Sequence, residues 1–377
     1  MTRKEFLQTV TGAAATAYMT SPSSAAPVAK AAVKLSASIY CYNGDIQAGT
    51  MSFEDCLADL ADMGAEGVEI LPEAHVPDYP NPPEKWVEQW FGWLEKYRLK
   101  PSAYDGFVDT KLYKNRALSV QELADQMIRD IKLANRLGYK VYRGQGSSWP
   151  DCLGPADSVW GRPGITQFDV YERVLPVAEK YDVKIGEEIH VPALLKSKWM
   201  DQTMNYIQKT GTRYLGFVPD MSIFLRRPQP GRRIEDLIRQ GYRKDILEYV
   251  NQAHEDNIPS TQAMDQVRKM GGTEAELRLA SGSGFYHMMY RKAEQNEPRD
   301  LASLIPHVFH IHAKFYEVLE DTSNESSIPY DEIIPVLARS GYDKFLSSEY
   351  EGDRSPFQAS QQIRRQHVMM RRMWAAA

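Results

Sequence analysis

Short β-prone runs and longer helical patterns alternate along the chain from Val33 onward. This alternation is typical of βα units, which build a parallel sheet. Four predicted helices end at a glycine, where a left-handed conformation is common, and a strand is predicted shortly after each: Gly64 precedes 67–70, Gly138 precedes 140–143, Gly211 precedes 214–218 and Gly341 precedes 344–347. Four more strands are predicted at 35–42, 100–104, 183–190 and 307–314, which makes eight. The pattern predicts an α/β fold, a single (β/α)8 TIM barrel over 33–377.

Two capping boxes mark where predicted helices begin. Ser52 is followed by Asp55, and Ser119 by Glu122, each three residues on. In this arrangement the two side chains satisfy backbone N–H groups at the start of the helix. Apolar residues then recur at helical spacing over 123–134, so this helix should lay one apolar face on the barrel.

The helix and strand rhythm is interrupted between the sixth and seventh predicted strands. About 80 residues separate Asp220 from His307, and a plain loop of that length is uncommon in a compact domain. We therefore predict a helical insertion at 224–303, with helical patterns around 234–254 and 260–269, and a C-terminal helix at 357–374. Since it leaves the end of a barrel strand, the insertion would form either a lid over the site or a surface for another subunit.

The N-terminus resembles a bacterial export signal. Thr2-Arg3-Lys4-Glu5-Phe6-Leu7 precedes an Ala/Thr/Gly-rich stretch, in the manner of twin-arginine signals but with Arg-Lys for Arg-Arg. We expect export to the periplasm, with 1–32 outside the fold; a disordered arm on a cytoplasmic protein is the alternative. No later stretch has the roughly 20 apolar residues that a membrane span needs, so no membrane partner is expected.

Composition and charge argue against a nucleic-acid partner. The chain has 377 residues, 43% hydrophobic and 25% charged, and its formal net charge is -5 with Lys and Arg spread along the sequence. A nucleic-acid-binding protein needs a basic face, so a small-molecule partner is favoured. Cys41, Cys56 and Cys152 have no metal-ligand spacing and are too few for a disulfide framework, so we expect free thiols.

Four predicted strand ends carry groups suited to a hard divalent cation: Glu188, Asp220, His312 and Glu349. Carboxylates that point into an apolar barrel are costly to bury without a compensating cation. Three carboxylates and one imidazole suit Mn2+, the ion we predict, or Mg2+ or Co2+, better than a thiolate-preferring metal. Taken singly, each residue is equally compatible with a surface or ion-paired group. A shift of one position in its strand would exchange Glu187 for Glu188.

Further polar residues lie near the same strand ends. Alternation along a strand places His190 on the face of Glu188, and His310 and Lys314 on the face of His312. Either of these two additional histidines could be a catalytic base, or could instead support a metal ligand. Substrate-binding candidates are Lys314, Arg143, Gln145 and Tyr40; a structural ion pair is an alternative for Lys314.

These segments, together with Leu137-Gly138-Tyr139-Lys140-Val141 and the closing 341–352, resemble the xylose-isomerase-like barrel superfamily of sugar isomerases and epimerases. The resemblance covers roughly 33–351. It implies that Glu188, Asp220, His312 and Glu349 hold one divalent metal, and that Glu188 and Glu349 also move the proton, as in ketose 3-epimerases. Catalysis would then be proton abstraction beside a sugar carbonyl.

Within the superfamily, the long insertion and the ending Ile363-Arg364-Arg365-Gln366-His367-Val368-Met369-Met370-Arg371-Arg372 are similar to the large subunits of bacterial C-glycoside deglycosidases. This similarity implies elimination from a 3-oxo-glycoside and a small second subunit, with a homo-oligomer as the alternative assembly. Two alternative functions are a ketose epimerase or isomerase and an inactive sugar-binding barrel. A third is metal-dependent phosphodiester cleavage, but the negative net charge of the chain argues against this one.

Overall fold

The computed structural model describes residues 32–108, 118–146, 166–226, 237–256, 258–281 and 296–377. Apart from residue 32, the predicted export segment lies outside these ranges. Cys152 also lies outside them, as do 227–236, 257 and 282–295 of the predicted insertion. Cys41 and Cys56 are free and buried.

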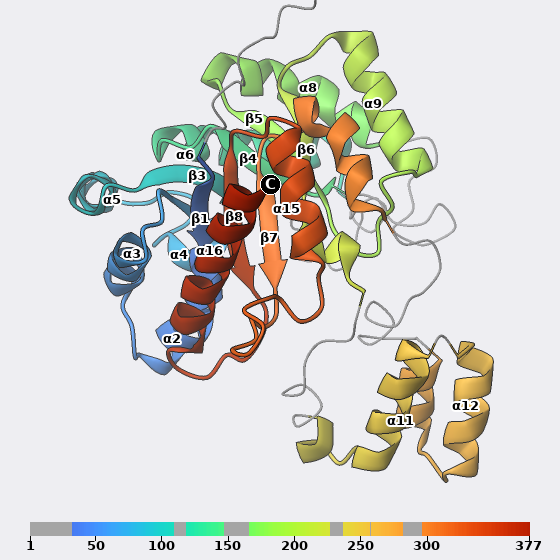
Figure 1. Cartoon of the computed structure of the whole chain (residues 1–377). Coiled ribbons are helices and arrows are strands. Elements are labelled where there is room, and N and C mark those ends of the chain that lie inside the picture. The colour runs from blue at the N-terminus through green and yellow to red at the C-terminus, as the bar shows by residue number, and fades with distance from the viewer. Residues whose placement is uncertain (1–31, 109–117, 147–165, 227–236, 257, 282–295) are drawn as a thin grey trace, which may run out of the picture. The chain divides into compact units, whose positions relative to one another are not determined.

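Eight parallel strands form a nearly closed barrel (Figure 1). They are β1 (Lys34–Ser38), β2 (Gly67–Ile70), β3 (Lys100–Asp105), β4 (Val141–Gly144), β5 (Lys184–Ile189), β6 (Leu215–Pro219), β7 (Ile311–Phe315) and β8 (Phe345–Tyr350). Their hydrogen-bonded order is β6-β5-β4-β3-β2-β1-β8-β7. β6 and β7 approach each other through isolated bridges, which pair Phe217 with Val308 and Asp220 with His312. The predicted (β/α)8 fold is confirmed.

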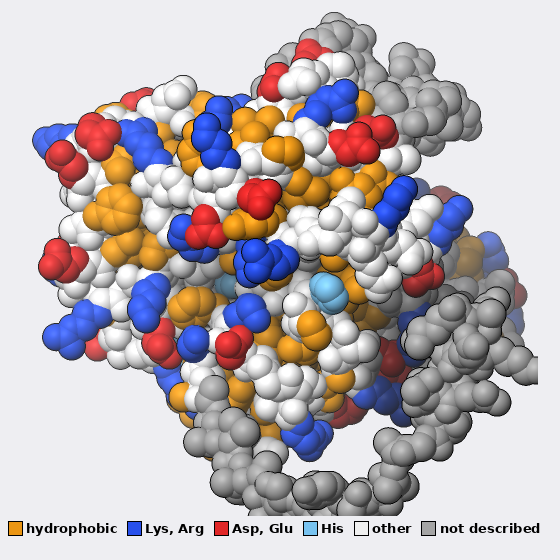
Figure 2. All heavy atoms as spheres, turned by 90° about the horizontal axis from the view of Figure 1, so that it is seen from above, with side chains coloured by type: hydrophobic (Ala, Val, Ile, Leu, Met, Phe, Trp, Pro, Cys, Tyr) orange, Lys and Arg blue, Asp and Glu red, His pale blue; other side chains and the backbone are white. Residues whose placement is uncertain are grey.

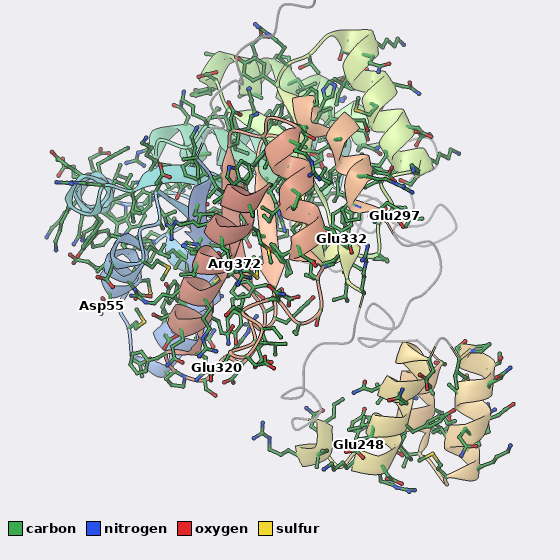
Figure 3. All side chains as sticks on the ribbon, viewed as in Figure 1. Asp55, Glu248, Glu297, Glu320, Glu332 and Arg372 are labelled. Carbon is green, nitrogen blue, oxygen red and sulfur yellow. The ribbon has the colours of Figure 1, made fainter. Side chains whose placement is uncertain are left out.

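Helices follow the strands along the chain. The α-helices of the barrel are α2 (Asn43–Ala48), α3 (Phe53–Asp62), α4 (Pro72–His75), α5 (Glu84–Tyr97), α6 (Val120–Arg136), α8 (Gln167–Tyr181), α9 (Lys198–Thr210), α15 (Tyr330–Arg339) and α16 (Gln358–Ala376). Both predicted capping boxes are present, at the starts of α3 and α6, and Figure 3 labels Asp55 of the first. The predicted apolar face of α6 is buried in the main core.

The largest differences from the predicted strand boundaries are at the end of β1 and the start of β7. β1 ends at Ser38, because the Ser38 hydroxyl accepts a hydrogen bond from the backbone N–H of Tyr40 and begins a 3-10 helix, η1 (Ile39–Tyr42). β7 begins at Ile311, four residues later than predicted, and the first predicted strand residue, His307, is instead the last residue of a second 3-10 helix, η6 (Ile305–His307). The backbone N–H of His307 donates to the oxygen of Leu304 at 2.8 Å within this turn, and so it does not pair with a neighbouring strand.

The C-terminal helix α16 packs against β8 and is tied down at several points. Gln366 donates to the backbone oxygen of Ala313 at 2.9 Å and accepts from Ser348 at 2.6 Å. His367 is fully buried, with Nε2 3.1 Å from the Ser348 hydroxyl. Near the end of the helix, Arg372, labelled in Figure 3, donates to the backbone oxygen of Ser323 at 2.9 Å. The outer faces of β7 and β8 are thereby covered.

Between β6 and β7 the structure describes 3-10 helices η4 (Met221–Phe224) and η5 (Pro298–Ser303) and three α-helices, α11 (Lys244–Glu255), α12 (Ser260–Lys269) and α13 (Glu274–Ala280). The three α-helices pack on one another around a separate apolar cluster that includes Ile246, Val250 and Val267. They fall within the segment where we predicted an insertion.

On the face drawn in Figure 2, basic and acidic side chains are interspersed with apolar ones. Within the described part of the chain, no helix has the length and apolarity that a membrane crossing requires.

Candidate metal centre

The four predicted ligands converge inside the barrel. Glu188 lies on β5, Asp220 directly follows β6, His312 lies on β7 and Glu349 on β8. All four are buried, and one ligand atom from each lies within 4.8 Å of the others. His312 Nδ1 is 2.9 Å from Glu188 Oε1, 3.3 Å from Glu349 Oε2 and 4.0 Å from Asp220 Oδ2. Residues that are far apart in the sequence thus form one compact donor set.

Local backbone geometry places the end of β5. Gly186 packs so closely that an added Cβ would lie 2.6 Å from Val218 Cγ2 of the next strand. Gly146 has a φ of +54°, and a Cβ there would lie 1.7 Å from the backbone oxygen of Glu188. Glycine tolerates both the left-handed conformation and the close approach. Small residues therefore let the neighbouring chain pass directly beside Glu188.

Asp220 is oriented by its own turn. Its Oδ1 accepts a hydrogen bond of 2.7 Å from the backbone N–H of Ser222, which starts η4. The other oxygen, Oδ2, points toward His312 and Lys314. The aspartate therefore acts both as a cap and as a site residue.

The donor set fits a hard divalent cation. Asp220 Oδ2 and Glu349 Oε2 are buried and accept no hydrogen bond of good geometry from the described residues, although Lys314 Nζ lies 3.3 Å from each. The described residues of the barrel interior include five buried carboxylates against two permanently charged cations: Glu69, Asp105, Glu188, Asp220 and Glu349 against Arg143 and Lys314. Buried charges need partners or a metal. A divalent cation would supply the missing positive charge.

Electrostatics keep two of the candidate ligands ionised. Burial alone would raise the pKa of Glu188, but the guanidinium of Arg143 and a hydrogen bond with His312 hold this pKa below its ordinary value. Burial would likewise raise the pKa of Glu349, yet Lys314 and His312 lower it well below its ordinary value. Two ionised carboxylates therefore face the centre at neutral pH.

The pKa values of the other two candidate ligands, Asp220 and His312, are raised above their ordinary values. Burial raises the pKa of Asp220 despite the nearby ammonium of Lys314. Burial would lower the pKa of His312, but the carboxylates of Glu69, Glu349 and Asp105 raise it well above the ordinary histidine value. A cation that binds His312 would therefore compete with a proton.

Arg143 and Gln145, both predicted to bind substrate, are buried in contacts within the protein. Arg143 Nη2 donates to Glu188 Oε2 at 2.8 Å, and its guanidinium stacks on the Phe107 ring at 4.2 Å. Gln145 donates to the backbone oxygen of Val108 at 2.8 Å. Arg143 thus orients one carboxylate of the donor set, and Gln145 holds the segment that follows β3.

Lys314 and Tyr40 both contact Glu351, and together with Arg354 they form a chain of polar side chains from the barrel interior to the surface. Lys314 is 2% exposed, and its Nζ lies 3.1 Å from Glu351 Oε1. The half-buried Tyr40 donates to the same oxygen at 3.4 Å, and Arg354 stacks over its ring at 5.0 Å. Burial and the charge of Glu351 raise the pKa of Tyr40, so its hydroxyl stays protonated. This path leads from the buried donor set to the exposed Arg354.

The two candidate base histidines differ in access. The side chain of His190 is 30% exposed, with Nε2 4.0 Å from Asp220 Oδ2 and Nδ1 2.7 Å from the backbone oxygen of Val191. His310 is fully buried, and its Nε2 lies 2.6 Å from Glu69 Oε2. Of the two, His190 can meet a substrate that enters from solvent.

The register of β5 is settled. Glu188 points into the donor set, whereas Glu187 is buried on the other face of the strand and accepts a hydrogen bond from the backbone N–H of Gly146. This adjacent pair of glutamates, with similar burial and opposite directions, provides a matched control for experiments on the site.

Sequence reasoning missed two acidic residues of the interior. Glu69 on β2 and Asp105 at the end of β3 are buried, and each has an oxygen 3.5 Å from His312 Nε2. Glu69, His310 and His312 also form a second group whose ligand atoms lie within 4.8 Å of one another. Burial and the charge of Asp105 raise the pKa of Glu69 well above its ordinary value. Their position at or near predicted strand ends was the available signal.

A sequence model of the xylose isomerase-like TIM barrel family matches residues 57–257, and the chain belongs to this family.

Curated relatives extend over nearly the whole chain. The 3'-dehydrocarminate deglycosidase alpha subunit of Microbacterium sp is 26% identical over 362 residues, which cover 90% of this chain and 95% of that protein. The C-glycoside deglycosidase alpha subunit of Arthrobacter globiformis is 25% identical over 356 residues, covering 92% and 93%. Among solved structures, D-allulose 3-epimerase from Methylomonas sp. has 10% identity and a TM-score of 0.51, covering 91% of this chain and 98% of that chain, a likeness of fold alone.

Proposed function

We propose that this protein is a metal-dependent carbohydrate enzyme, the large subunit of a C-glycoside deglycosidase-type enzyme that cleaves 3-oxo-glycosides by elimination. The observation that carries the proposal is the convergence of Glu188, Asp220, His312 and Glu349 in a buried set fit for a cation. The names and nearly full-length coverage of the two deglycosidase relatives support the substrate class.

These four side chains would hold one divalent cation, for which we propose Mn2+, with Mg2+ or Co2+ as alternatives. When bound, a cation of this kind polarises a carbonyl oxygen and stabilises the negative charge that develops on it. Arg143 keeps Glu188 in place through its 2.8 Å hydrogen bond. The ammonium of Lys314 adds a second fixed positive charge beside Asp220 and Glu349.

The proton transfer is assigned to residues around this set. In a 3-oxo-glycoside, the ketone acidifies the C2–H bond. A base takes that proton, the C–H electron pair becomes a C1–C2 double bond, and the bond from C1 to the aglycone breaks with its electrons leaving on the aglycone, which then takes up a proton. We assign the base to His190, because Nδ1 of its neutral form donates to the backbone oxygen of Val191 and Nε2 therefore carries the lone pair.

A second reaction deserves its own test, because Glu188 and Glu349 lie 2.9 Å and 3.3 Å from the same nitrogen of His312. Two carboxylates around one centre could take a proton from one face of a carbon and return it to the other, which is epimerisation. A ketose epimerase is therefore the alternative enzyme, and Glu188 and Glu349 would then be its acid and base.

We also propose a small second subunit as partner, since both relatives are named alpha subunits. A homo-oligomer is the alternative assembly. Export through a twin-arginine-type signal at 1–32 is part of the same proposal and rests on the sequence alone.

The test begins with metal content. Purified protein is compared with Glu188→Gln and Glu349→Gln by elemental analysis, with Glu187→Gln as the matched control. We expect a near-stoichiometric metal in the wild type and in the control, and its loss in the two site variants. No metal in the wild type, and none taken up when Mn2+ is supplied, would refute the metal-dependent mechanism.

Substrates then separate the reactions. The protein is assayed with 3-oxo-glycosides and with free ketohexoses, with and without a co-expressed small subunit. Aglycone release supports the deglycosidase and ketose interconversion supports the epimerase. A metal-loaded protein that binds sugars and turns over neither substrate would be an inactive binding barrel.

A further inference from the structure

The two ring nitrogens of His312 face different groups. Nδ1 faces the candidate ligands, 2.9 Å from Glu188 Oε1 and 3.3 Å from Glu349 Oε2. Nε2 faces Glu69 Oε1 and Asp105 Oδ1, each 3.5 Å away. A neutral imidazole has one lone pair and one proton on its two nitrogens. For His312 to complete the four-residue set, the lone pair must lie on Nδ1 and the proton on Nε2.

Glu69 is placed to enforce this arrangement. Its side chain is fully buried, and its carboxylate reaches both histidines of β7, with Oε2 2.6 Å from His310 Nε2 and Oε1 beside His312 Nε2. Whether this carboxyl is ionised or carries a proton on Oε2 toward His310, Oε1 only accepts hydrogen bonds, so a lone pair on His312 Nε2 would face an oxygen that cannot donate. A buried acceptor with no donor is unfavourable.

We propose that Glu69 is a positioning residue that keeps the remaining proton of His312 on Nε2 and thereby presents Nδ1 to the cation. Asp105 is the second acceptor for the same proton. This inference rests on the proposed metal site and assigns a function to a strand outside the donor set. Outer carboxylates that hold the free N–H of a histidine ligand are a general means of fixing the tautomer.

A second metal ion is the competing interpretation, because Glu69, His310 and His312 also approach within 4.8 Å. His312 could serve both ions only by losing both ring protons, and His310 Nε2 is already engaged by Glu69 at 2.6 Å. The geometry therefore favours a proton, and not a second cation, between Glu69 and His312.

The experiment compares two uncharged substitutions of Glu69 that differ in their ability to accept a hydrogen bond. Glu69→Met fills a similar volume but cannot accept a hydrogen bond. Glu69→Gln keeps an oxygen that can accept from His312 Nε2–H, while its amide can donate to His310 once that ring changes tautomer. Affinity is measured by titrating the metal-free protein with Mn2+ alone and following the electron paramagnetic resonance signal of free Mn2+. Melting of each metal-free variant monitors folding separately.

We expect Glu69→Met to weaken Mn2+ binding by about 10- to 100-fold, and Glu69→Gln to weaken it distinctly less. Equal weakening in the two variants would show that charge alone matters and would overturn the inference, as would wild-type affinity in both. Two equivalents of Mn2+ per chain, with one lost in each variant, would support the second-metal interpretation instead.

A measurement on the unaltered protein keeps the inference testable if the variants fail to fold. In protein labelled with 15N-histidine and loaded with Zn2+, we expect a ligand histidine with metal on Nδ1 and a proton on Nε2. Metal on Nε2 would overturn the tautomer assignment while leaving the metal site intact. Absence of metal binding in the wild type would overturn the proposed function and this inference with it.

Discussion

His367 on α16 should make the stability of the protein depend on pH. Its imidazole is fully buried beside Ser348, and burial, helped by the positive charges of Arg371 and Arg364, lowers its pKa to about 3. In the unfolded chain the value should be about 6.5. Because the folded pKa is lower, the unfolded chain binds more protons as the pH falls, and stability is lost from about pH 6.5 downward, until the folded form also titrates near pH 3.

The two pKa values set the size of the effect. At pH 5 almost every unfolded chain carries the proton and almost no folded chain does, which gives a loss of about 2 kcal/mol relative to neutral pH. His367→Gln removes the titration while its amide can still reach the Ser348 hydroxyl. We expect the wild type to lose about 2 kcal/mol more than the variant between pH 7.5 and pH 5.

Urea denaturation at the two pH values measures this difference. Other titrating groups, including the candidate metal ligands, are present in both proteins and cancel in the comparison. Whatever packing the substitution disturbs appears equally at both pH values and cancels as well. Parallel stability curves for wild type and variant would refute the claim that His367 is held neutral in the folded protein.

Four further outcomes are expected. Gly146→Ala should lower stability by roughly 1–3 kcal/mol, because a side chain there meets the backbone of Glu188 at a positive φ; the melting temperature checks this, and an unchanged value would contradict it. Ser119→Ala should cost about 1 kcal/mol by removing the cap of α6, whereas Ser119→Thr should not, as urea denaturation would show. Lys314→Met should destabilise the metal-free protein by about 3–5 kcal/mol, since three carboxylates lose a buried partner, and Mn2+ should restore more of the melting temperature than it adds to the wild type; equal shifts would argue against the site. Residues 1–32 fused to a reporter should direct it to the periplasm, and Arg3→Gln should abolish this export; a reporter that stays in the cytoplasm would contradict the signal.

The sequence allowed the donor set to be predicted because two regularities act together. Parallel strands of a barrel end on one face, and side chains alternate along each strand, so Glu188, Asp220, His312 and Glu349 had a common place to meet. Glu69 and Asp105 were not predicted because a single acid at a strand end is equally typical of an exposed position. Their role depends on which nitrogen of a distant histidine they face.

Other features of the structure were not predicted because they depend on individual contacts that sequence patterns do not encode. The bond from Arg143 to Glu188 was not predicted, because Glu188 lies on the adjacent strand, 45 residues away in the chain; sugar binding by Arg143 stays a prediction. β1 was predicted to extend to Tyr42, but one hydroxyl, that of Ser38, caps a 3-10 helix and ends the strand. Strand propensity is similar on both sides of that point, so only the local hydrogen bond decides.

The gap between β6 and β7 bears on the proposed metal site. These two strands share only isolated bridges among the described residues, whereas the other neighbouring strands share ladders, and the longest connection between consecutive strands runs between them (Figure 1). Asp220 and His312, two of the four candidate ligands, face each other across this gap as one of those bridges. A cation bound by both residues would link β6 to β7, the neighbouring strands that share the fewest backbone contacts. Loss of the cation would then weaken the contact between β6 and β7 as well as remove positive charge. The closure of the barrel would therefore depend on whether the cation is bound.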